Sequence, residues 1–314
     1  VEHICLPRAA PISIARQTLV LLHKADTKIP TGTARWLDGR SVARHFHIRP
    51  DLPRDMQRIS RILSGRGIGL VLSGGGARGF AHVGVIKALE GAGIPIDLIG
   101  GSSIGAVMGM VLALGLDADA VAAAVRKAFL QHPMGNVTGD YNFIPLVSLI
   151  KGARSRSAMA QALRDATGRA AIDSEDSWIT FFTVASNFST GREAVLMRGD
   201  IIRNVGASYA IPGELPPIFV GGHMMYDGGT FNNFPVDVMA QLGAGRIIGV
   251  DLSVDREQVF DIDCVPGTLA LLRDKLRPRA KRRYPLPSVP ETLLRSSFIT
   301  SLSKQKAMGQ FTDL

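Results

Sequence analysis

The fold is decided by residues 68–105, which read IGLVLSGGGARGFAHVGVIKALEGAGIPIDLIGGSSIG. This stretch begins with a short apolar run, passes through a glycine-rich turn and continues as a helix pattern from Phe80 to Glu90. Asp97–Gly100 forms a second short apolar run, and a second glycine-containing turn leads into an apolar helix pattern that ends near Leu116. Two successive strand-turn-helix units predict parallel strands, because each helix returns the chain to the start of the sheet. We therefore expect an α/β fold with a mostly parallel central sheet.

The rest of the chain predicts additions at both ends of this core. The chain has 314 residues, which fits one large α/β domain with a tail or two small domains. Further strand patterns occur between Ile179 and Val250, and none follows Asp255. We expect a basic amino-terminal extension at residues 1–67, irregular apart from a polar helix at residues 51–63, then the α/β core at 68–255 and a basic carboxy-terminal tail at 256–314.

The composition restricts the classes of function. Lysine and arginine number 36 against 27 acidic residues, and the net charge of +9 favours an anionic partner such as nucleic acid or phospholipid head groups. The chain has only two cysteines, Cys5 and Cys264, which excludes a disulfide framework and a four-thiolate metal site. No apolar run reaches the roughly 18–20 residues that a membrane-spanning helix needs.

Basic residues are concentrated near the carboxyl end, where seven of them stand against one acid, Asp274. They are Arg273, Lys275, Arg277, Arg279, Lys281, Arg282 and Arg283. Tyr284 is the only nearby aromatic residue that could stack on a nucleic-acid base. We therefore expect no nucleic acid at this stretch, and both an anionic membrane surface as its partner and a solvated tail stay open.

The second glycine-containing turn carries a candidate nucleophile. Gly101-x-Ser103-x-Gly105 lies between a predicted strand and a predicted helix, which is where a nucleophile elbow must lie. A sharp turn there forces strained backbone angles on Ser103, and the two glycines make room for it. The hydroxyl is then exposed at the carboxyl edge of the sheet, near the positive end of a helix.

The first glycine turn allows two interpretations. Gly74–Gly79 matches the Gly-x-Gly-x-x-Gly dinucleotide fingerprint, but no acidic residue ends the second strand to hold a ribose, and Asp97 lies at its wrong end. An oxyanion hole needs consecutive backbone N–H groups close to the nucleophile, and this turn supplies them at the same sheet edge. The candidate donors are Gly75, Gly76 and Ala77. Arg78 either reinforces them or hydrogen-bonds carbonyl groups of the loop.

A serine nucleophile also needs a base. His82 lies in the helix after the glycine turn and is better explained as a packed residue, while His223 lies at the turn of the predicted hairpin. Asp227 ends a strand and is followed by Gly228 and Gly229, which allow backbone and substrate to approach it. Asp227 is therefore the better candidate for the base.

Taken together, these motifs resemble the signatures of the patatin-like phospholipases. Gly74–Gly79, the Ser103 elbow and Asp227-Gly228-Gly229 occur in the family's order, and residues 207–213 are similar to the segment that precedes the family's aspartate. Within the family the chain resembles the neuropathy target esterase type. That type shares a lead-in like residues 30–37 and 45–49, and the resemblance extends from about Leu19 to Asp251.

The resemblance implies a three-layer fold and a Ser103–Asp227 dyad that acts without histidine, metal or cofactor. It also implies a glycine-rich oxyanion hole and hydrolysis of acyl esters in phospholipids or lysophospholipids. A lipid-binding or signalling module without turnover stays open as the alternative. Longer members carry a membrane anchor and nucleotide-binding modules ahead of the esterase region. We therefore expect a cytoplasmic protein that binds a membrane peripherally or through a segment absent from this chain.

Overall fold

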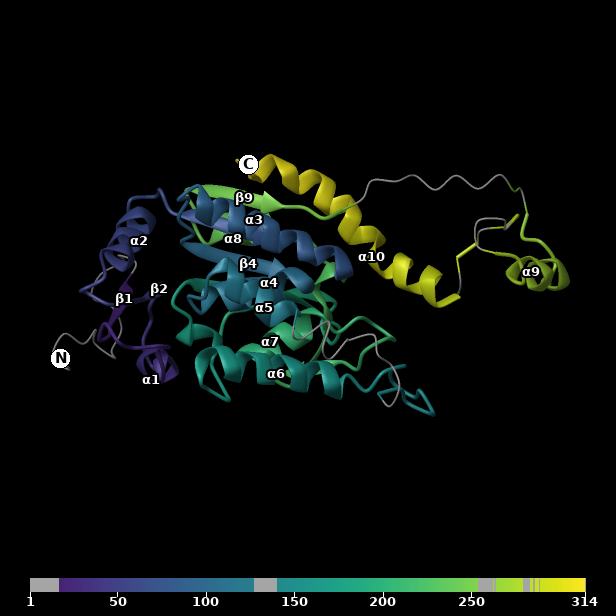
Figure 1. Cartoon of the computed structure of the whole chain (residues 1–314), viewed down its shortest axis with the longest axis horizontal. Coiled ribbons are helices and arrows are strands. Elements are labelled where there is room, and N and C mark those ends of the chain that lie inside the picture. The colour runs from purple at the N-terminus through teal and green to yellow at the C-terminus, as the bar shows by residue number, and fades with distance from the viewer. Residues whose placement is uncertain are drawn as a thin grey trace.

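A seven-stranded sheet forms the centre of the structure, a computed structural model shown in Figure 1. Its strands run in the spatial order β7-β8-β5-β4-β3-β9, and β6 pairs with the other side of β5 from β8. Their bounds are β3 (Ile68–Leu72), β4 (Leu98–Ser102), β5 (Thr180–Asn187), β6 (Arg192–Leu196), β7 (Ile218–Val220), β8 (His223–Asp227) and β9 (Arg246–Val250). The structure describes residues 17–126, 140–253, 262, 264–278, 283–284, 286–287 and 289–313.

The parallel part of the sheet is the part that the sequence predicts. β9, β3, β4 and β5 are parallel neighbours, whereas β6 and β8 pair with β5 in the antiparallel sense and β7 pairs with β8 in the same way. Because the carboxyl ends of β3 and β4 are neighbours, the two glycine turns that follow them lie at one edge of the sheet. The expectation of an α/β fold with a mostly parallel central sheet is confirmed.

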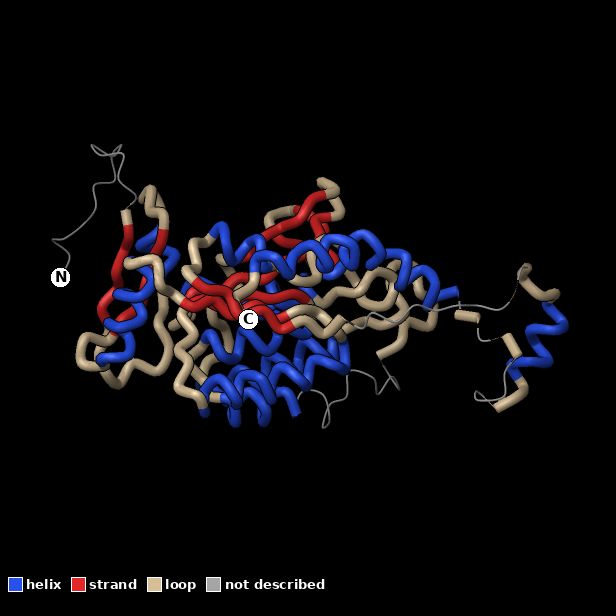
Figure 2. The backbone as a smooth tube through the Cα atoms, turned by 90° about the horizontal axis from the view of Figure 1, so that it is seen from above, coloured by secondary structure: helices blue, strands red, loops and turns tan. Residues whose placement is uncertain are grey.

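Helices cover both faces of this sheet, and Figure 2 shows the strands between them. One hydrophobic core lies between the sheet and five helices, and a second core, which includes Phe182 and Val184 of β5, lies between the sheet and two others. The first set comprises α3 (Phe80–Gly91), α4 (Ile104–Ala113), α5 (Ala118–Arg126), α6 (Ala153–Thr167) and α7 (Ile201–Ser208). The second comprises α2 (Pro53–Leu63) and α8 (Val236–Gln241). The fold therefore has three layers.

The most apolar helix is the one that follows Ser103. Every residue of α4 is buried, since the sheet lies on one side of it and α5 and α7 on others. A helix that is apolar on all sides is expected where no side meets water. None of the described helices is both long and apolar enough to cross a bilayer.

The predicted helix at residues 51–63 is confirmed as α2, and outside it the expectation of an irregular amino-terminal extension is wrong for the described part. β1 (Thr18–Leu22) and β2 (Arg44–Ile48) form a small parallel sheet, with α1 (Thr33–Leu37) between them in the chain. Phe46 and Ile48 of β2 pack against Ile59 and Ile62 of α2 in the second core. β1 has only five residues, and most of them are half-buried, so it shows little hydrophobic alternation. This explains why the sequence did not predict the strand.

Part of the carboxy-terminal tail returns to the core. α9 (Thr268–Lys275) stands apart from the body in Figure 1, and α10 (Val289–Met308) lies across the sheet region beside the turn after β8. Lys304 of α10 forms ion pairs with Asp237 at 2.8 Å and with Glu193 at 3.3 Å. Of the predicted basic stretch, Arg279, Lys281 and Arg282 lie outside the described residues. The division at residues 67 and 255 stays a proposal.

Candidate active site

Ser103 lies at a sharp turn between the last residue of β4 and the first residue of α4. Its backbone angles are φ 53° and ψ −122°, and within the described ranges no other non-glycine residue has a positive φ. Steric crowding requires glycine at both flanking positions. A Cβ on Gly101 would lie 2.7 Å from the backbone of Gly105, and a Cβ on Gly105 would collide with the carbonyl oxygen of Leu72. The predicted elbow geometry is therefore present at Ser103.

The side chain of Ser103 is bonded to the predicted acid. Its Oγ donates to Oδ2 of Asp227 at 2.8 Å, across 124 positions of sequence. Its backbone N–H donates to Oγ of Ser208 at 2.9 Å, and that hydroxyl in turn donates to the carbonyl oxygen of Val184 at 2.6 Å. Ser103 is only partly buried, so the hydroxyl is both held in place and within reach of a ligand.

Asp227 ends β8 with its carboxylate enclosed by protein, at 1% exposure. Oδ1 accepts from the N–H of Gly229 at 2.7 Å, which leaves Oδ2 for Ser103. Burial is the main reason that the pKa of Asp227 is raised to about 7. Hydrogen bonds from Gly229 and Ser103 lower that pKa, and the charge of Glu214 raises it. A carboxylate with this pKa is a much stronger base than an exposed one and can accept a proton from a hydroxyl.

The glycine turn after β3 lies against the same site. A Cβ on Gly74 would lie 3.1 Å from Cβ of Ser103, so the two turns are in close contact. Gly76 has φ 56°, and a Cβ there would meet open space. Throughout the described part of the chain, the N–H groups of Gly75, Gly76 and Ala77 have no hydrogen-bond acceptor. Three neighbouring donors are thus available to a ligand beside Ser103.

Arg78, the fourth residue predicted for the oxyanion hole, hydrogen-bonds within the glycine turn. Its backbone N–H donates to the carbonyl oxygen of Gly75 at 3.2 Å, and its Nε donates to the same oxygen at 3.3 Å. Of the two roles considered for Arg78, the structure shows the one in which it hydrogen-bonds a loop carbonyl. Its exposed guanidinium stabilises the turn, because it holds Gly75 in place.

The histidines lie away from this pair. His82 is fully buried, and its Nε2–H donates to the carbonyl oxygen of Ser73 at 2.9 Å. His223 is exposed at the far end of β8 from Asp227. In the residues that the structure describes, no histidine bonds to Ser103 or Asp227, and no cluster of His, Cys, Asp or Glu could hold a metal ion.

The dinucleotide interpretation also lacks its acidic residue in the structure. Asp97 is fully buried at the amino end of β4, opposite to the edge that carries the glycine turns. It accepts from Arg61 at 2.7 Å and from the N–H of Ile68 at 2.9 Å, so both oxygens are used within the protein. Asp97 fastens α2 to the sheet and cannot reach a ribose at the other edge.

The site contains supporting residues that the sequence did not reveal. Asn233 Nδ2 donates to the carbonyl oxygen of Gly74 at 3.2 Å and to Oε1 of Gln305 at 3.1 Å, and the N–H of Asn233 donates to Oγ of Ser301 at 3.1 Å. Ser301 and Gln305 belong to α10. No motif marks Asn233 or α10, whereas Ser208 lies in the segment already noted at residues 207–213.

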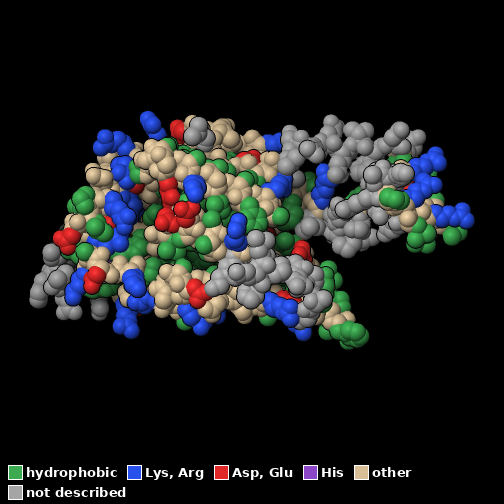
Figure 3. All heavy atoms as spheres, in the orientation of Figure 1, with side chains coloured by type: hydrophobic (Ala, Val, Ile, Leu, Met, Phe, Trp, Pro, Cys, Tyr) green, Lys and Arg blue, Asp and Glu red, His purple; other side chains and the backbone are tan. Residues whose placement is uncertain are grey.

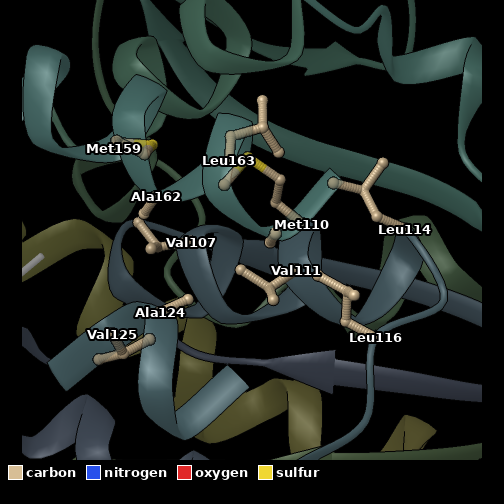
Figure 4. Close-up of a pocket in the computed structure, with 11 residues that line it drawn as sticks. Val107, Met110, Val111, Leu114, Leu116, Ala124, Val125, Met159, Ala162 and Leu163 are labelled. Atoms are coloured by element: carbon tan, nitrogen blue, oxygen red, sulfur yellow. The ribbon is translucent and has the colours of Figure 1, made fainter. Parts of the chain in front are cut away.

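An apolar pocket opens along the helix that Ser103 begins. Side chains of α4, α5 and α6 line it, and Figure 4 shows them around a hollow with no charged group. The lining starts at Val107, one turn after Ser103, and continues through Met110 and Val111 on α4, with Met159 and Leu163 on α6. The pocket therefore offers apolar contacts and no polar side chain to a ligand.

These features define a class of protein before any comparison. A hydroxyl at a strained strand-to-helix turn, bonded to a buried carboxylate beside unpaired backbone amides, is typical of serine hydrolases built on an α/β sheet. The chain belongs to the patatin-like phospholipase family, since the family description Patatin-like phospholipase matches residues 70–240.

Curated relatives agree with this assignment. The chain is 30% identical over 322 residues to patatin-like phospholipase domain-containing protein 6 of Homo sapiens, covering 91% of this chain and 22% of that protein. It is 33% identical to neuropathy target esterase sws of Drosophila melanogaster, covering 76% and 18%. It is 31% identical to lysophospholipase NTE1 of Kluyveromyces lactis, covering 88% and 19%. The chain thus spans about a fifth of the length of these relatives.

Proposed function

We propose that this chain is a serine esterase that hydrolyses acyl esters of phospholipids or lysophospholipids. The observation that carries the proposal is the 2.8 Å hydrogen bond from Ser103 Oγ to Asp227 Oδ2 at a strained turn. In this proposal Ser103 is the nucleophile, Asp227 is the base, and the N–H groups of Gly75, Gly76 and Ala77 form the oxyanion hole.

The reaction follows from the positions of these groups. Asp227 takes the proton of Ser103 as Oγ attacks the ester carbonyl carbon, and the three amides stabilise the negative charge that develops on the carbonyl oxygen. Collapse of the intermediate breaks the ester bond, and the departing alcohol takes the proton from Asp227. Water then loses a proton to Asp227 and attacks the acyl-serine. Breaking the acyl bond releases the fatty acid, and Ser103 Oγ takes the proton back from Asp227, which restores both groups.

Two observations support a lipid as the substrate. An apolar pocket begins at Val107, one turn after Ser103 in the chain, and all the side chains that line it are apolar. The curated relatives carry the names of phospholipase, esterase and lysophospholipase.

The direct test is covalent labelling of the purified chain with a fluorophosphonate, followed by identification of the modified residue. We expect labelling at Ser103 and hydrolysis of at least one substrate in a panel of diacyl phospholipids, lysophospholipids and short p-nitrophenyl esters. A chain that binds these lipids but is neither labelled nor active would instead be a lipid-binding module on the same scaffold.

The raised pKa of Asp227 predicts a pH profile. Asp227 must be ionised to accept the proton, so kcat/KM for a soluble ester is expected to rise with pH and level off above about 7, the pKa of Asp227. Below that value activity should fall by about tenfold per pH unit, as expected when one group must be deprotonated. Rates measured from acidic to mildly alkaline pH provide the test, and a flat profile through the acidic range would contradict it.

Glu214 offers a matched control for this profile. Its charge raises the pKa of Asp227, and its side chain is not bonded to Ser103 or Asp227. Glu214→Gln removes the charge with little change of shape, so the midpoint should move to lower pH while the plateau rate is kept. An unchanged midpoint would mean that another group controls the profile.

A further inference from the structure

One loop of the molecule exposes apolar side chains to an unusual degree. Residues 141–149, which we call the apolar loop, read YNFIPLVSL and lie between the described start at Asp140 and α6. The large exposed side chains of the loop are Tyr141 (53%), Phe143 (101%), Ile144 (68%), Leu146 (88%), Val147 (63%) and Leu149 (45%). In Figure 1 the loop is the teal hairpin that projects from the body at the lower right, and Figure 3 shows a hydrophobic tip there.

The apolar loop is held in shape at its base. Tyr141 and Ile150 form an antiparallel bridge, and the N–H of Asn142 donates to the carbonyl oxygen of Leu149 at 2.9 Å. The side chain of Asn142 donates to the carbonyl oxygen of Ser148 at 2.8 Å. Hydrogen bonds at the base of the loop therefore hold its exposed apolar tip in a defined conformation.

The loop is joined to the segment that supports the candidate active site. The N–H of Leu149 donates to the carbonyl oxygen of Gly213, and the N–H of Ile150 donates to that of Glu214, both at 2.9 Å. A few residues earlier in the same segment, Ser208 accepts from the N–H of Ser103, and the carbonyl oxygen of Ala210 accepts from the N–H of Asp227. The apolar tip is thus fixed relative to the Ser103–Asp227 pair.

The basic residues after the loop and the position of its tip indicate which kind of surface the tip contacts. Lys151 and Arg154 are exposed directly after the loop, where they would face anionic head groups if the tip entered a bilayer. In Figure 1 the tip lies at the end of the long axis toward which the β9 arrow points. β3 and β4 are parallel to β9, so their carboxyl ends, which the glycine turns follow, point toward the same end. The tip and the catalytic edge of the sheet therefore face the same way.

A second apolar surface lies toward that end of the molecule. Leu269 and Leu272 of α9 and Leu276 directly after it are exposed at helical spacing, and Arg273 and Arg277 are exposed near them in the chain. Figures 1 and 2 both place α9 at the end of the molecule opposite to the amino-terminal extension. Basic residues next to an exposed apolar helix face are typical of segments that bind at a membrane interface.

We propose that the apolar loop inserts into the surface of a lipid bilayer and holds the Ser103 site against it. Phe143, Ile144, Leu146 and Val147 enter the head-group and acyl boundary, and Lys151 and Arg154 contact anionic head groups. The reason for such docking rests on the proposed function, because a phospholipid substrate resides in a bilayer. Binding to the bilayer requires no turnover and can be measured without it.

The test is co-sedimentation with vesicles made of equal amounts of phosphatidylcholine and phosphatidylserine. Phe143→Ser combined with Leu146→Ser should weaken vesicle binding by at least about tenfold, because apolar side chains that leave water supply the affinity. The control is Leu22→Ser combined with Leu63→Ser, two leucines that are also more than half exposed but lie at the opposite end of the molecule, and this variant should bind as the unmodified chain does. Thermal unfolding midpoints check that both variants fold.

A second measurement places the tip in the bilayer directly. Phe143→Trp should add fluorescence that vesicles of brominated phosphatidylcholine quench, whereas Leu63→Trp should not. Equal vesicle binding by the loop variant and the unmodified chain, or no added quenching at position 143, would overturn the proposal. A chain that forms a dimer through the loop, and binds vesicles equally with and without the loop substitutions, would make a second copy the partner and also overturn it. Failure of fluorophosphonate labelling would refute the proposed function while leaving the vesicle result interpretable.

Discussion

Ser103→Ala is expected to lower ester turnover by at least about 1,000-fold, and Asp227→Asn by a similar factor, because nucleophile and base act as one unit. The double variant should be no slower than the slower single variant. Alanine removes only the Oγ that donates to Asp227, and asparagine keeps the shape of the carboxylate and an oxygen for the N–H of Gly229. The measurement is kcat/KM on a soluble short-chain ester, with the thermal unfolding midpoint as a check of folding.

Two other residues provide controls for these variants. Ser102 is buried one residue before Ser103, and its hydroxyl has no hydrogen-bond partner in the described structure, so Ser102→Ala should retain activity. His223→Ala should also retain activity, since His223 is exposed at the far end of β8. If Ser103→Ala kept more than about a thousandth of the activity, the nucleophile would be elsewhere. Loss of activity in folded His223→Ala would indicate a triad.

The parts of the site that could be predicted are those fixed by local backbone requirements. β3 occupies Ile68–Leu72 as the apolar run indicates, and β4 ends at Ser102, directly before the predicted elbow. At Gly101 and Gly105 no side chain fits, and at Ser103 the turn demands a positive φ. Because such constraints restrict residue types at fixed spacing, the sequence shows them, and the pairing of parallel strands then places both glycine turns together.

The parts that could not be predicted depend on contacts between distant segments. Asn233 reaches Gly74 across 159 positions and Gln305 across 72, and a side-chain amide leaves no periodic pattern in the sequence. Whether the guanidinium of Arg78 hydrogen-bonds a carbonyl oxygen depends on the conformation of the turn, which the residue types alone do not determine. The exposure of the apolar loop could not be predicted either, because a short apolar run can be a buried strand as readily as an exposed tip.

The oxyanion hole can be tested at Ala77 more cleanly than at the glycines before it. Gly76 has φ 56°, whereas proline requires about −65°, so Gly76→Pro changes the course of the turn as well as removing an N–H donor. Ala77 lies in the first turn of the short 3-10 helix Gly76–Gly79, where proline is tolerated, and it is exposed. Ala77→Pro therefore removes one donor with the least disturbance of the backbone.

Ala77→Pro is expected to lower kcat on a soluble ester by about 100- to 1,000-fold, the usual effect of losing one oxyanion donor. Gly75→Pro and Gly76→Pro should cost at least about 100-fold, because the donor and the shape of the turn are lost together. Ala77→Gly keeps the N–H and should stay within a few-fold of the unmodified chain, which separates the donor from the side chain. The fluorophosphonate adds a second readout, since its phosphoryl oxygen occupies the same hole and Ala77→Pro should slow the labelling of Ser103 as well. Full activity of Ala77→Pro and of both glycine variants would place the oxyanion hole elsewhere, and the unpaired amides beside Ser103 would then need another role.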